Sequence, residues 1–145
     1  MLELSGAPFC TGRAEFLDEP LPPTGKSPRI YVKVAAEGME EPFLALLDTG
    51  AEWSVLDKEI AEAVGLDQSQ GTPTSLRHSN GTSSGFLSRV TIRLLADEGA
   101  DLSVDATVFV PDERFGKSVI GYSTFLEQVR LGLDPQSNHF YFGGC

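Results

Sequence analysis

One aspartate in this sequence follows directly after a strongly apolar segment. Asp48 comes after the run Phe43–Leu47, and Thr49, Gly50 and Ala51 follow it. A carboxylate at the end of an apolar strand is unusual, because burying an unpaired charge is expensive. A carboxylate held in such a place is a candidate for general acid–base chemistry, in which it exchanges a proton with water or a substrate.

The three residues after Asp48 have the types that a tight loop around a carboxylate requires. Thr49 supplies a hydroxyl that can bond to backbone across the loop. Gly50 can adopt backbone conformations that other residues rarely adopt, and it lets another chain approach closely. Ala51 is small and leaves room beside the carboxylate. The plain alternative is an Asx-turn between two strands, which is common for Asp-Thr-Gly alone. Apolar residues on both sides of the motif extend the pattern and favour the catalytic interpretation.

The segment before this loop predicts two strands joined by a turn. Apolar residues at 30, 32 and 34 alternate with Tyr31 and Lys33, which is the period of a half-buried strand. Residues 37–41 form the turn. The continuous apolar run that follows predicts a strand covered on both faces, and this strand leads directly into Asp48.

The segment after the loop predicts a short helix and then a polar hairpin. Asp57 is suited to cap a helix that begins at the next residue, and Gly65 closes it. Residues 72–85 are mostly small and polar. Within them, Asn80-Gly81 predicts a tight turn because both residues tolerate positive φ. We therefore expect a hairpin with this dipeptide at its tip.

The remainder of the chain predicts further strands, so the expected fold class is mostly β with one or two short helices. Strands are expected at residues 86–95, 104–110, 119–121, 129–133 and 139–142. Thr124 and Glu127 have the spacing of a capping box, which predicts the second short helix. Asp134-Pro135 is the turn of a closing hairpin.

The length of 145 residues fits one domain with a hydrophobic core. Residues 1–27 are expected to form an irregular N-terminal arm, because Pro20, Pro22 and Pro23 remove backbone donors and fix φ. Residues 28–145 form the domain. The arm either packs along the domain or reaches a partner subunit, and both alternatives are open.

The amino-acid composition argues against several classes of function. The formal net charge is −10 and the chain has only 11 Lys and Arg residues, which argues against nucleic-acid binding because phosphates require clustered cations. No apolar run approaches the roughly 20 residues that span a bilayer, so no membrane partner is expected. The first residues lack the basic and apolar regions of a secretory signal, and a cytoplasmic location is the expectation.

The two cysteines, Cys10 and Cys145, lack the spacing of a metal site. Free thiols are expected in a reducing compartment, and a bridge within or between subunits is the alternative. No phosphate-binding glycine loop and no metal-binding HExxH motif is present. No metal and no cofactor are therefore expected.

Several segments in order resemble one known family. Residues 43–56 resemble the active-site segment of the retropepsin-like aspartic peptidases, in their divergent bacterial and cellular branch. Residues 75–86 resemble the flap hairpin of that family, and residues 119–121 resemble the motif that braces the active-site loop. The resemblance covers about residues 29–142. It implies the closed β-barrel of the acid protease fold, in a homodimer.

The resemblance also implies a reaction. The chain has only one Asp-Thr-Gly, so Asp48 would meet its symmetry mate in a homodimer. Like charges this close do not both ionise, so the pair shares a proton. The ionised carboxylate would activate a water, and the protonated one would polarise the scissile carbonyl. Thr49 would bond to the other subunit's loop, and Gly50 would face the substrate backbone. The implied function is that of an aspartic endopeptidase acting on peptides or proteins.

The same resemblance assigns substrate-binding and flap roles to residues of the loop and the hairpin. These residues are Glu52, Trp53, His78, Ser79, Asn80, Gly81 and Thr82. The hairpin is expected to close over an extended peptide. Trp53 either packs under the loop or lines a subsite, and His78 is either a lone surface histidine or a pH-sensitive flap contact. Asn80-Gly81-Thr82 also matches a glycosylation sequon, which no secretory signal supports.

Two positions depart from the retroviral pattern. Trp53 stands where retroviral members often have a polar residue, and Tyr122 follows Gly121 where they have an arginine. These departures leave a second interpretation open. In it, the chain is a non-catalytic module that keeps the retropepsin fold for dimerisation or peptide binding.

Overall fold

The computed structural model describes residues 3–18 and 29–145. Strands account for most of this part of the chain, together with the α-helix α1 (Lys58–Ala63) and two short 3-10 helices, η1 (Gln68–Gln70) and η2 (Leu126–Gln128). The predicted mostly-β class is confirmed. None of the helices in these two segments is long and apolar enough to cross a membrane.

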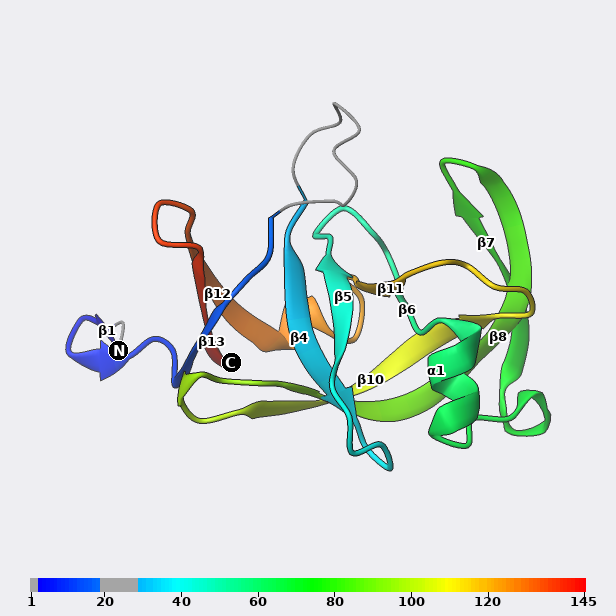
Figure 1. Cartoon of the computed structure of the whole chain (residues 1–145), viewed down its shortest axis with the longest axis horizontal. Helices are drawn as coiled ribbons and strands as arrows, with labels where there is room; N and C mark the ends of the chain where they lie inside the picture. The colour runs from blue at the N-terminus through cyan, green and yellow to red at the C-terminus, as the bar shows by residue number, and fades with distance from the viewer. Residues whose placement is uncertain (1–2, 19–28) are drawn as a thin grey trace.

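The larger sheet closes into a barrel (Figure 1). Its strands are, in order around the barrel, β10 (Leu102–Pro111), β6 (Ser54–Val55), β11 (Ser118–Ile120), β5 (Phe43–Leu47), β4 (Tyr31–Ala36) and β8 (Gly81–Leu94). Because β10 pairs with both β6 and β8, these six strands form a closed ring. The seventh strand, β7 (Thr72–His78), pairs only with β8 and forms a long hairpin that projects from the barrel.

Alternating residues of β10 show how the strands divide their side chains between two hydrophobic clusters. Val104, Ala106 and Val108 are buried in the main core. Their spacing of two residues is the one expected for a strand with one face toward the core. Phe109 is fully buried in a second cluster with residues of β5, β6 and β11. Partly buried Trp53 packs against this second cluster. The loop after β5 therefore rests on its own apolar support.

The strand before Asp48 is confirmed as β5, with one difference from the prediction. Ala45 and Leu46 are buried, but Leu44 is 47% exposed. The expectation of a strand covered on both faces is therefore wrong at this residue. In the register of the sheet, Leu44 lies opposite Lys33 of β4, whose side chain is also exposed. This part of the barrel wall faces solvent.

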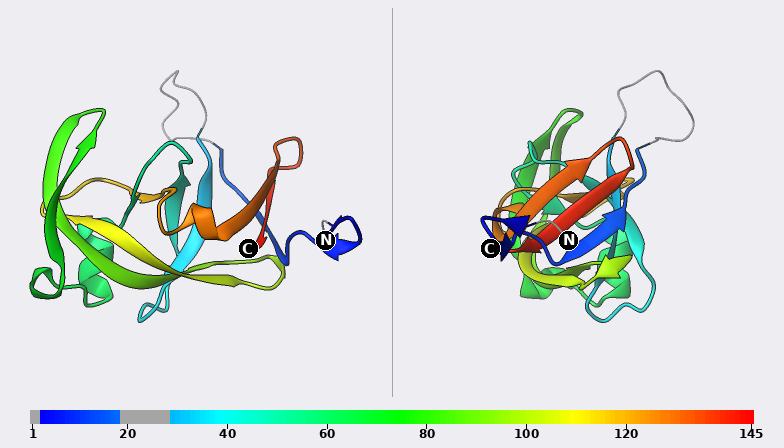
Figure 2. Two further views of the ribbon diagram at one scale, coloured as in Figure 1. Left: turned by 180° about the vertical axis from the view of Figure 1, so that it is seen from behind. Right: turned by 90° about the vertical axis from the view of Figure 1, so that its left-hand side faces the viewer.

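A smaller sheet joins a strand near the N-terminus to the two C-terminal strands. Figure 2 (right) shows β12 (Val129–Asp134), β13 (His139–Gly144) and β3 (Gly12–Glu15) side by side, and β9 (Glu98–Gly99) completes the order. The prediction of an irregular arm is wrong at β3, which pairs with β13 so that Ala14 lies opposite Phe140. Ala14 and Phe16 are buried in the core.

The rest of the N-terminal segment divides into a described and an undescribed part. β1 (Glu3–Leu4) and β2 (Ala7–Pro8) form a small hairpin before β3. The cluster Pro20, Pro22 and Pro23 and the boundary between residues 27 and 28 lie outside the described residues. Of the two cysteines, Cys10 is buried and Cys145 is exposed, and they are not joined as a disulfide.

The predicted helix after the loop is confirmed as α1. Asp57 caps it, because its Oδ1 accepts a hydrogen bond from the backbone N–H of Lys58 at 2.9 Å. Gly65 follows the helix with φ +79°, a conformation that favours glycine at a helix end. The same Oδ1 of Asp57 also accepts from the N–H of Phe115 at 3.0 Å. The cap therefore ties a distant loop to the start of the helix.

The predicted capping box at Thr124 forms only in part. The backbone N–H of Thr124 donates to the Glu127 side chain, as expected. The Thr124 hydroxyl is used elsewhere, since it donates to the carbonyl of Thr107 and accepts from its N–H. The helix is a single 3-10 turn, η2, and Phe125 at its start is fully buried.

The hairpin of β7 and β8 is confirmed, but its tip lies one residue earlier than predicted. His78 pairs with Gly81, so the two turn residues are Ser79 and Asn80. Gly81 has φ +126°, whereas Asn80 is not among the residues with positive φ. The expectation that both Asn80 and Gly81 take positive φ at the centre of the turn is wrong, because Gly81 already belongs to the strand.

Candidate active site

The Asp48 carboxylate is oriented by its own loop. The backbone N–H of Gly50 donates to Asp48 Oδ1 at 2.9 Å, and the N–H of Ala51 donates to the Asp48 carbonyl at 3.2 Å. The N–H of Asp48 donates to the carbonyl of Ile120 at 3.0 Å, which joins the loop to β11. Asp48 is half-buried. The orientation of the carboxylate is therefore fixed, and the side chain stays accessible to solvent.

The segment after β11 braces this loop from behind. Tyr122 N–H donates to the Ala51 carbonyl at 2.8 Å, and Ser123 N–H donates to the Glu52 carbonyl at 2.7 Å. At Gly121 the two segments touch so closely that an added Cβ would lie 2.4 Å from the carbonyl oxygen of Trp53. Only glycine fits at this contact without moving backbone.

Two buried serines complete the brace. Ser54 Oγ accepts from the N–H of Gly121 at 2.9 Å, and Ser118 Oγ accepts from the N–H of Asp57 at 3.1 Å. Ser54 and Ser118 are 1% and 5% exposed, respectively. A buried backbone donor that loses its acceptor is costly, so both hydroxyls have a structural reason to be present.

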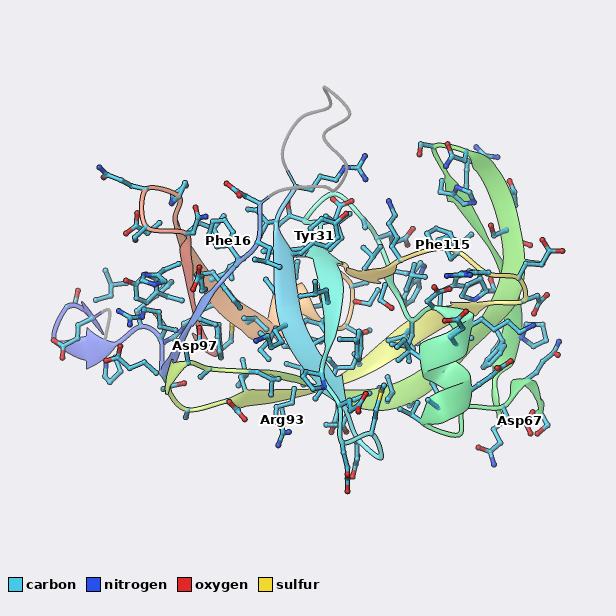
Figure 3. All side chains as sticks on the ribbon, viewed as in Figure 1. Phe16, Tyr31, Asp67, Arg93, Asp97 and Phe115 are labelled. Carbon is cyan, nitrogen blue, oxygen red and sulfur yellow. The ribbon has the colours of Figure 1, made fainter. Side chains whose placement is uncertain are left out.

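A groove of about 750 Å³ lies in front of the Asp48 loop. Three segments line it: the loop after β5, the tip of the β7–β8 hairpin, and the loop between β10 and β11. Figure 3 shows Phe115 on this last loop, which runs across toward the hairpin. The rings of Phe115 and His78 meet edge to face with centroids 5.2 Å apart. The hairpin and the loop therefore form two walls that touch at one end.

Most of the predicted site residues line this groove. Those that do are Asp48, Gly50, Ala51, Glu52, Trp53, His78, Ser79 and Asn80. Thr49, Gly81 and Thr82 do not line it, and all three are exposed. The structure thus brings the loop and the hairpin together, while the individual roles given to these residues stay predictions.

The two residues with alternative interpretations both make defined contacts. Trp53 packs on the apolar cluster beneath the loop and also lines the groove, and its place in a substrate subsite stays a prediction. His78 is not an isolated surface histidine. Its Nδ1 accepts from the N–H of Asn80 at 3.2 Å, and its Nε2 lies 2.8 Å from Ser83 Oγ. A pH-dependent role for this contact stays a prediction.

Sequence reasoning missed one whole wall of the groove. The loop between β10 and β11 contributes Arg114, Phe115 and Lys117. Further lining residues that were not predicted are Leu46, Val55, Ser75, Leu76, Arg77, Ser83 and Val119. One signal was available for the loop, because Phe115 is a lone aromatic residue among charged and small neighbours. Nothing local in the sequence indicates that it lies near the hairpin.

The site contains carboxylates but no arrangement for a metal. Within residues 3–18 and 29–145, no three His, Cys, Asp or Glu side chains come together as possible ligands. Asp48 and Glu52 line the groove from the loop after β5, and basic side chains line it from other segments. The arrangement is therefore that of a positioned carboxylate beside a partly apolar groove.

A closed β-barrel with an Asp-Thr-Gly loop, braced by the glycine that follows a short strand, defines the aspartic protease class. The sequence model of the gag-polyprotein putative aspartyl protease family matches residues 32–128. The chain belongs to this family, and its fold is retropepsin-like. No curated protein sequence matches the chain.

Solved structures are similar in fold. A retropepsin-like aspartic protease from Rickettsia conorii superposes with a TM-score of 0.59 at 16% identity, covering 93% of this chain and 94% of that one. The EIAV protease in complex with the inhibitor HBY-793 gives a TM-score of 0.48 at 23% identity, covering 64% and 81%. The first similarity extends over nearly the whole chain and supports the fold.

Proposed function

We propose that this chain is an aspartic endopeptidase that hydrolyses peptide bonds of peptide or protein substrates. The observation that carries the proposal is the position of Asp48. Its carboxylate is half-buried, is oriented by the N–H of Gly50, and opens onto a groove of about 750 Å³. A groove of this size accommodates a segment of extended peptide. Membership of an aspartyl protease family supports the same chemistry.

The proposed active site needs a second copy of the chain. The sequence contains a single Asp-Thr-Gly, whereas the mechanism requires two carboxylates. A two-fold axis beside the loop would bring Asp48 next to its symmetry mate. Thr49 is exposed, which leaves it available to the loop of the partner subunit. In such a pair the two carboxyl groups share one proton and titrate together.

Each step of the proposed reaction has a residue to perform it. The ionised Asp48 of one copy removes a proton from water, which attacks the scissile carbonyl, while the protonated Asp48 of the other copy donates to the carbonyl oxygen. The C–N bond then breaks as the first carboxyl gives its proton to the leaving amine and the second takes a proton back from the hydroxyl of the intermediate, which leaves the pair with one shared proton. The substrate lies extended and bonds through its backbone, as peptides do when added to a sheet edge. The hairpin tip at Ser79 and Asn80 closes over it and reduces access of bulk water.

Replacing Asp48 by Asn tests the proposal. Asn keeps the size of the side chain but cannot act as a base, so cleavage of a peptide library at mildly acid pH should vanish while the fold and the dimer persist. Asp18→Asn is the control, because Asp18 is an exposed carboxylate outside the groove. Undiminished cleavage by the Asp48→Asn protein would remove Asp48 from the reaction.

A non-catalytic module is the second candidate. One observation favours it: the retroviral enzymes have an arginine after the glycine of the brace, and here Tyr122 stands there and is 54% exposed. A pepstatin-type inhibitor separates the two candidates. Raised thermal stability with the inhibitor supports the peptidase, while a dimer that neither cleaves at any pH nor responds to the inhibitor supports the module. The cytoplasmic location stays a prediction from the sequence.

A further inference from the structure

Asp57 is a side chain outside the groove that reaches one of the groove's walls. Its Oδ1 accepts from the backbone N–H of Lys58 at 2.9 Å, which caps α1, and from the N–H of Phe115 at 3.0 Å. Phe115 lines the groove from the loop between β10 and β11, whereas Asp57 does not line it. One carboxylate oxygen therefore serves both the helix and a wall of the groove.

Other contacts hold the two ends of this loop. At its start, the N–H of Asp112 donates to the carbonyl of Ser84 on β8 at 2.9 Å. At its end, Ser118 begins β11, and its buried Oγ accepts from the N–H of Asp57 at 3.1 Å. Between these ends, the bond from the N–H of Phe115 to the Asp57 carboxylate holds the middle of the loop.

A second link between α1 and the middle of the loop is weaker. Arg114 Nε lies 3.7 Å from Glu59 Oε1, and the two side chains are 75% and 67% exposed, so solvent screens the pair and its contribution is small. A backbone N–H that donates to a carboxylate forms a shorter and more directional bond. The position of Phe115 therefore depends on Asp57 more than on this ion pair.

Phe115 connects the loop to the hairpin of β7 and β8. Its ring meets that of His78 edge to face with centroids 5.2 Å apart, a geometry that stabilises an aromatic pair beyond the area it buries. His78 in turn contacts the tip of the hairpin, because its ring bonds the N–H of Asn80 and Ser83 Oγ. A continuous series of contacts therefore runs from the start of α1 to the tip of the hairpin.

We propose that Asp57 is a positioning residue for the groove: by holding the N–H of Phe115, it sets where the Phe115 ring supports the hairpin. Its effect on peptide binding rests on the proposed function. A displaced hairpin should weaken the binding of a peptide in the groove and leave the chemistry at Asp48 intact. The Asp48 loop is held by other bonds, from the N–H of Gly50 and to the carbonyl of Ile120.

Two substitutions of Asp57 separate this role from that of the helix cap. Asp57→Asn keeps an oxygen in the place of Oδ1 that can accept both bonds. Asp57→Ser keeps a preferred capping residue, but its Oγ is one bond closer to the backbone and should no longer reach the N–H of Phe115. Asp67→Ser is the matched control, because Asp67 caps η1 by accepting from the N–H of Ser69 at 2.9 Å and does not line the groove.

The imidazole NMR signals of His78 report the position of the Phe115 ring without any substrate. The chain has two histidines, so His139→Ala identifies the signals of His78. At one fixed pH, Phe115→Leu defines the change in chemical shift that loss of the ring causes. Asp57→Ser should reproduce most of this change, whereas Asp57→Asn and Asp67→Ser should leave the signals as in the wild type. Unmoved His78 signals in Asp57→Ser would overturn the proposal.

Peptide kinetics test the consequence for the groove. On a peptide that the wild-type protein cleaves, Asp57→Ser and Phe115→Leu should each raise KM about tenfold and keep kcat within about twofold, the scale of one hydrogen bond to a charged group. The double variant should be no worse than either single one, because both changes interrupt the same series of contacts. Phe115→Leu leaves the cap at Asp57 in place, and an unchanged KM in this variant would also refute the proposal.

The two measurements separate this proposal from that of catalysis. If the wild-type protein cleaves no peptide, the proposed function fails, and the His78 signals still decide whether Asp57 positions the hairpin. If peptides are cleaved but the Asp57→Ser protein keeps both the wild-type KM and the wild-type His78 signals, the positioning role fails and the proposed peptidase activity stands.

Discussion

The backbone N–H of Gly121 donates a hydrogen bond of 2.9 Å to Ser54 Oγ, and this serine is 1% exposed. Ser54 begins β6, directly after the loop that carries Asp48, while Gly121 directly follows β11. The bond therefore joins two segments that are 67 residues apart in sequence. It makes the position of the carboxylate depend on the packing of the barrel.

Ser54→Ala should destabilise the protein by about 1–3 kcal/mol, because the N–H of Gly121 would remain buried without an acceptor. Urea unfolding measures the change. Ser84→Ala is the matched control, since Ser84 is exposed on β8 and should change stability by less than about 0.5 kcal/mol. Equal midpoints for the two variants would show that the buried bond contributes nothing.

Gly121→Ala adds a single methyl group but should strongly disturb the active-site loop. The new methyl would lie 2.4 Å from the Trp53 carbonyl oxygen and 2.9 Å from that of Ala51, and both are backbone atoms. Overpacking of this kind costs about 1–3 kcal/mol. Gly144→Ala meets its nearest atom at 3.8 Å and serves as the control. Changed Trp53 fluorescence in Gly121→Ala alone would support the close contact, and unchanged stability would contradict it.

Much of the fold around Asp48 could be predicted because its signals are local. The alternation of β4 and the apolar run of β5 lie within the strands they specify, and the cap at Asp57 directly precedes its helix. The helix and the strands were therefore expected in the right order. The burial of each face was harder to predict, as exposed Leu44 shows, because it depends on neighbouring elements.

The parts that sequence reasoning missed are set by long-range contacts. β3 is short and lies in a segment rich in proline. It is a strand because it pairs with β13. Gly12 fits there because a Cβ would lie 2.4 Å from the Ala100 carbonyl oxygen. Similarly, Lys117 reaches the groove because the next residue begins β11, which pairs with β5. No local pattern indicates such pairings.

His78 should hold the tip of the hairpin through both nitrogens of its ring. Nδ1 accepts from the N–H of Asn80, so the ring proton is on Nε2, which donates to Ser83 Oγ. Removal of the ring would leave the Asn80 N–H without this acceptor. Protection of the Asn80 amide against hydrogen exchange should therefore fall when the ring is absent.

His78→Ala provides the matching test of this contact by NMR. At one fixed pH, exchange at the Asn80 amide should be faster than in the wild type, whereas His139→Ala, which changes the other histidine of the chain, should leave it unchanged. Exchange at Asn80 that is the same in both variants would show that the imidazole does not hold the tip.

Ser137 lowers the pKa of the Asp134 carboxyl from its ordinary value of 3.8, chiefly because its hydroxyl donates to the carboxylate. A depressed pKa in the folded state means that the carboxylate stabilises the fold above pH 3.8, and this contribution is lost as the pH falls through the folded-state pKa. Ser137→Ala should raise the pKa of Asp134, followed by NMR of the carboxyl carbon. An unchanged titration would exclude Ser137 as the cause.

An active site that needs Asp48 from two copies has a direct kinetic signature. Wild-type and Asp48→Asn proteins are mixed at constant total concentration, allowed to exchange subunits, and assayed on one peptide. If both carboxylates are required, activity falls with the square of the wild-type fraction, to about one quarter at equal mixing. A linear fall, to about one half, would mean that each copy acts with its own Asp48 and would contradict a dyad shared between subunits.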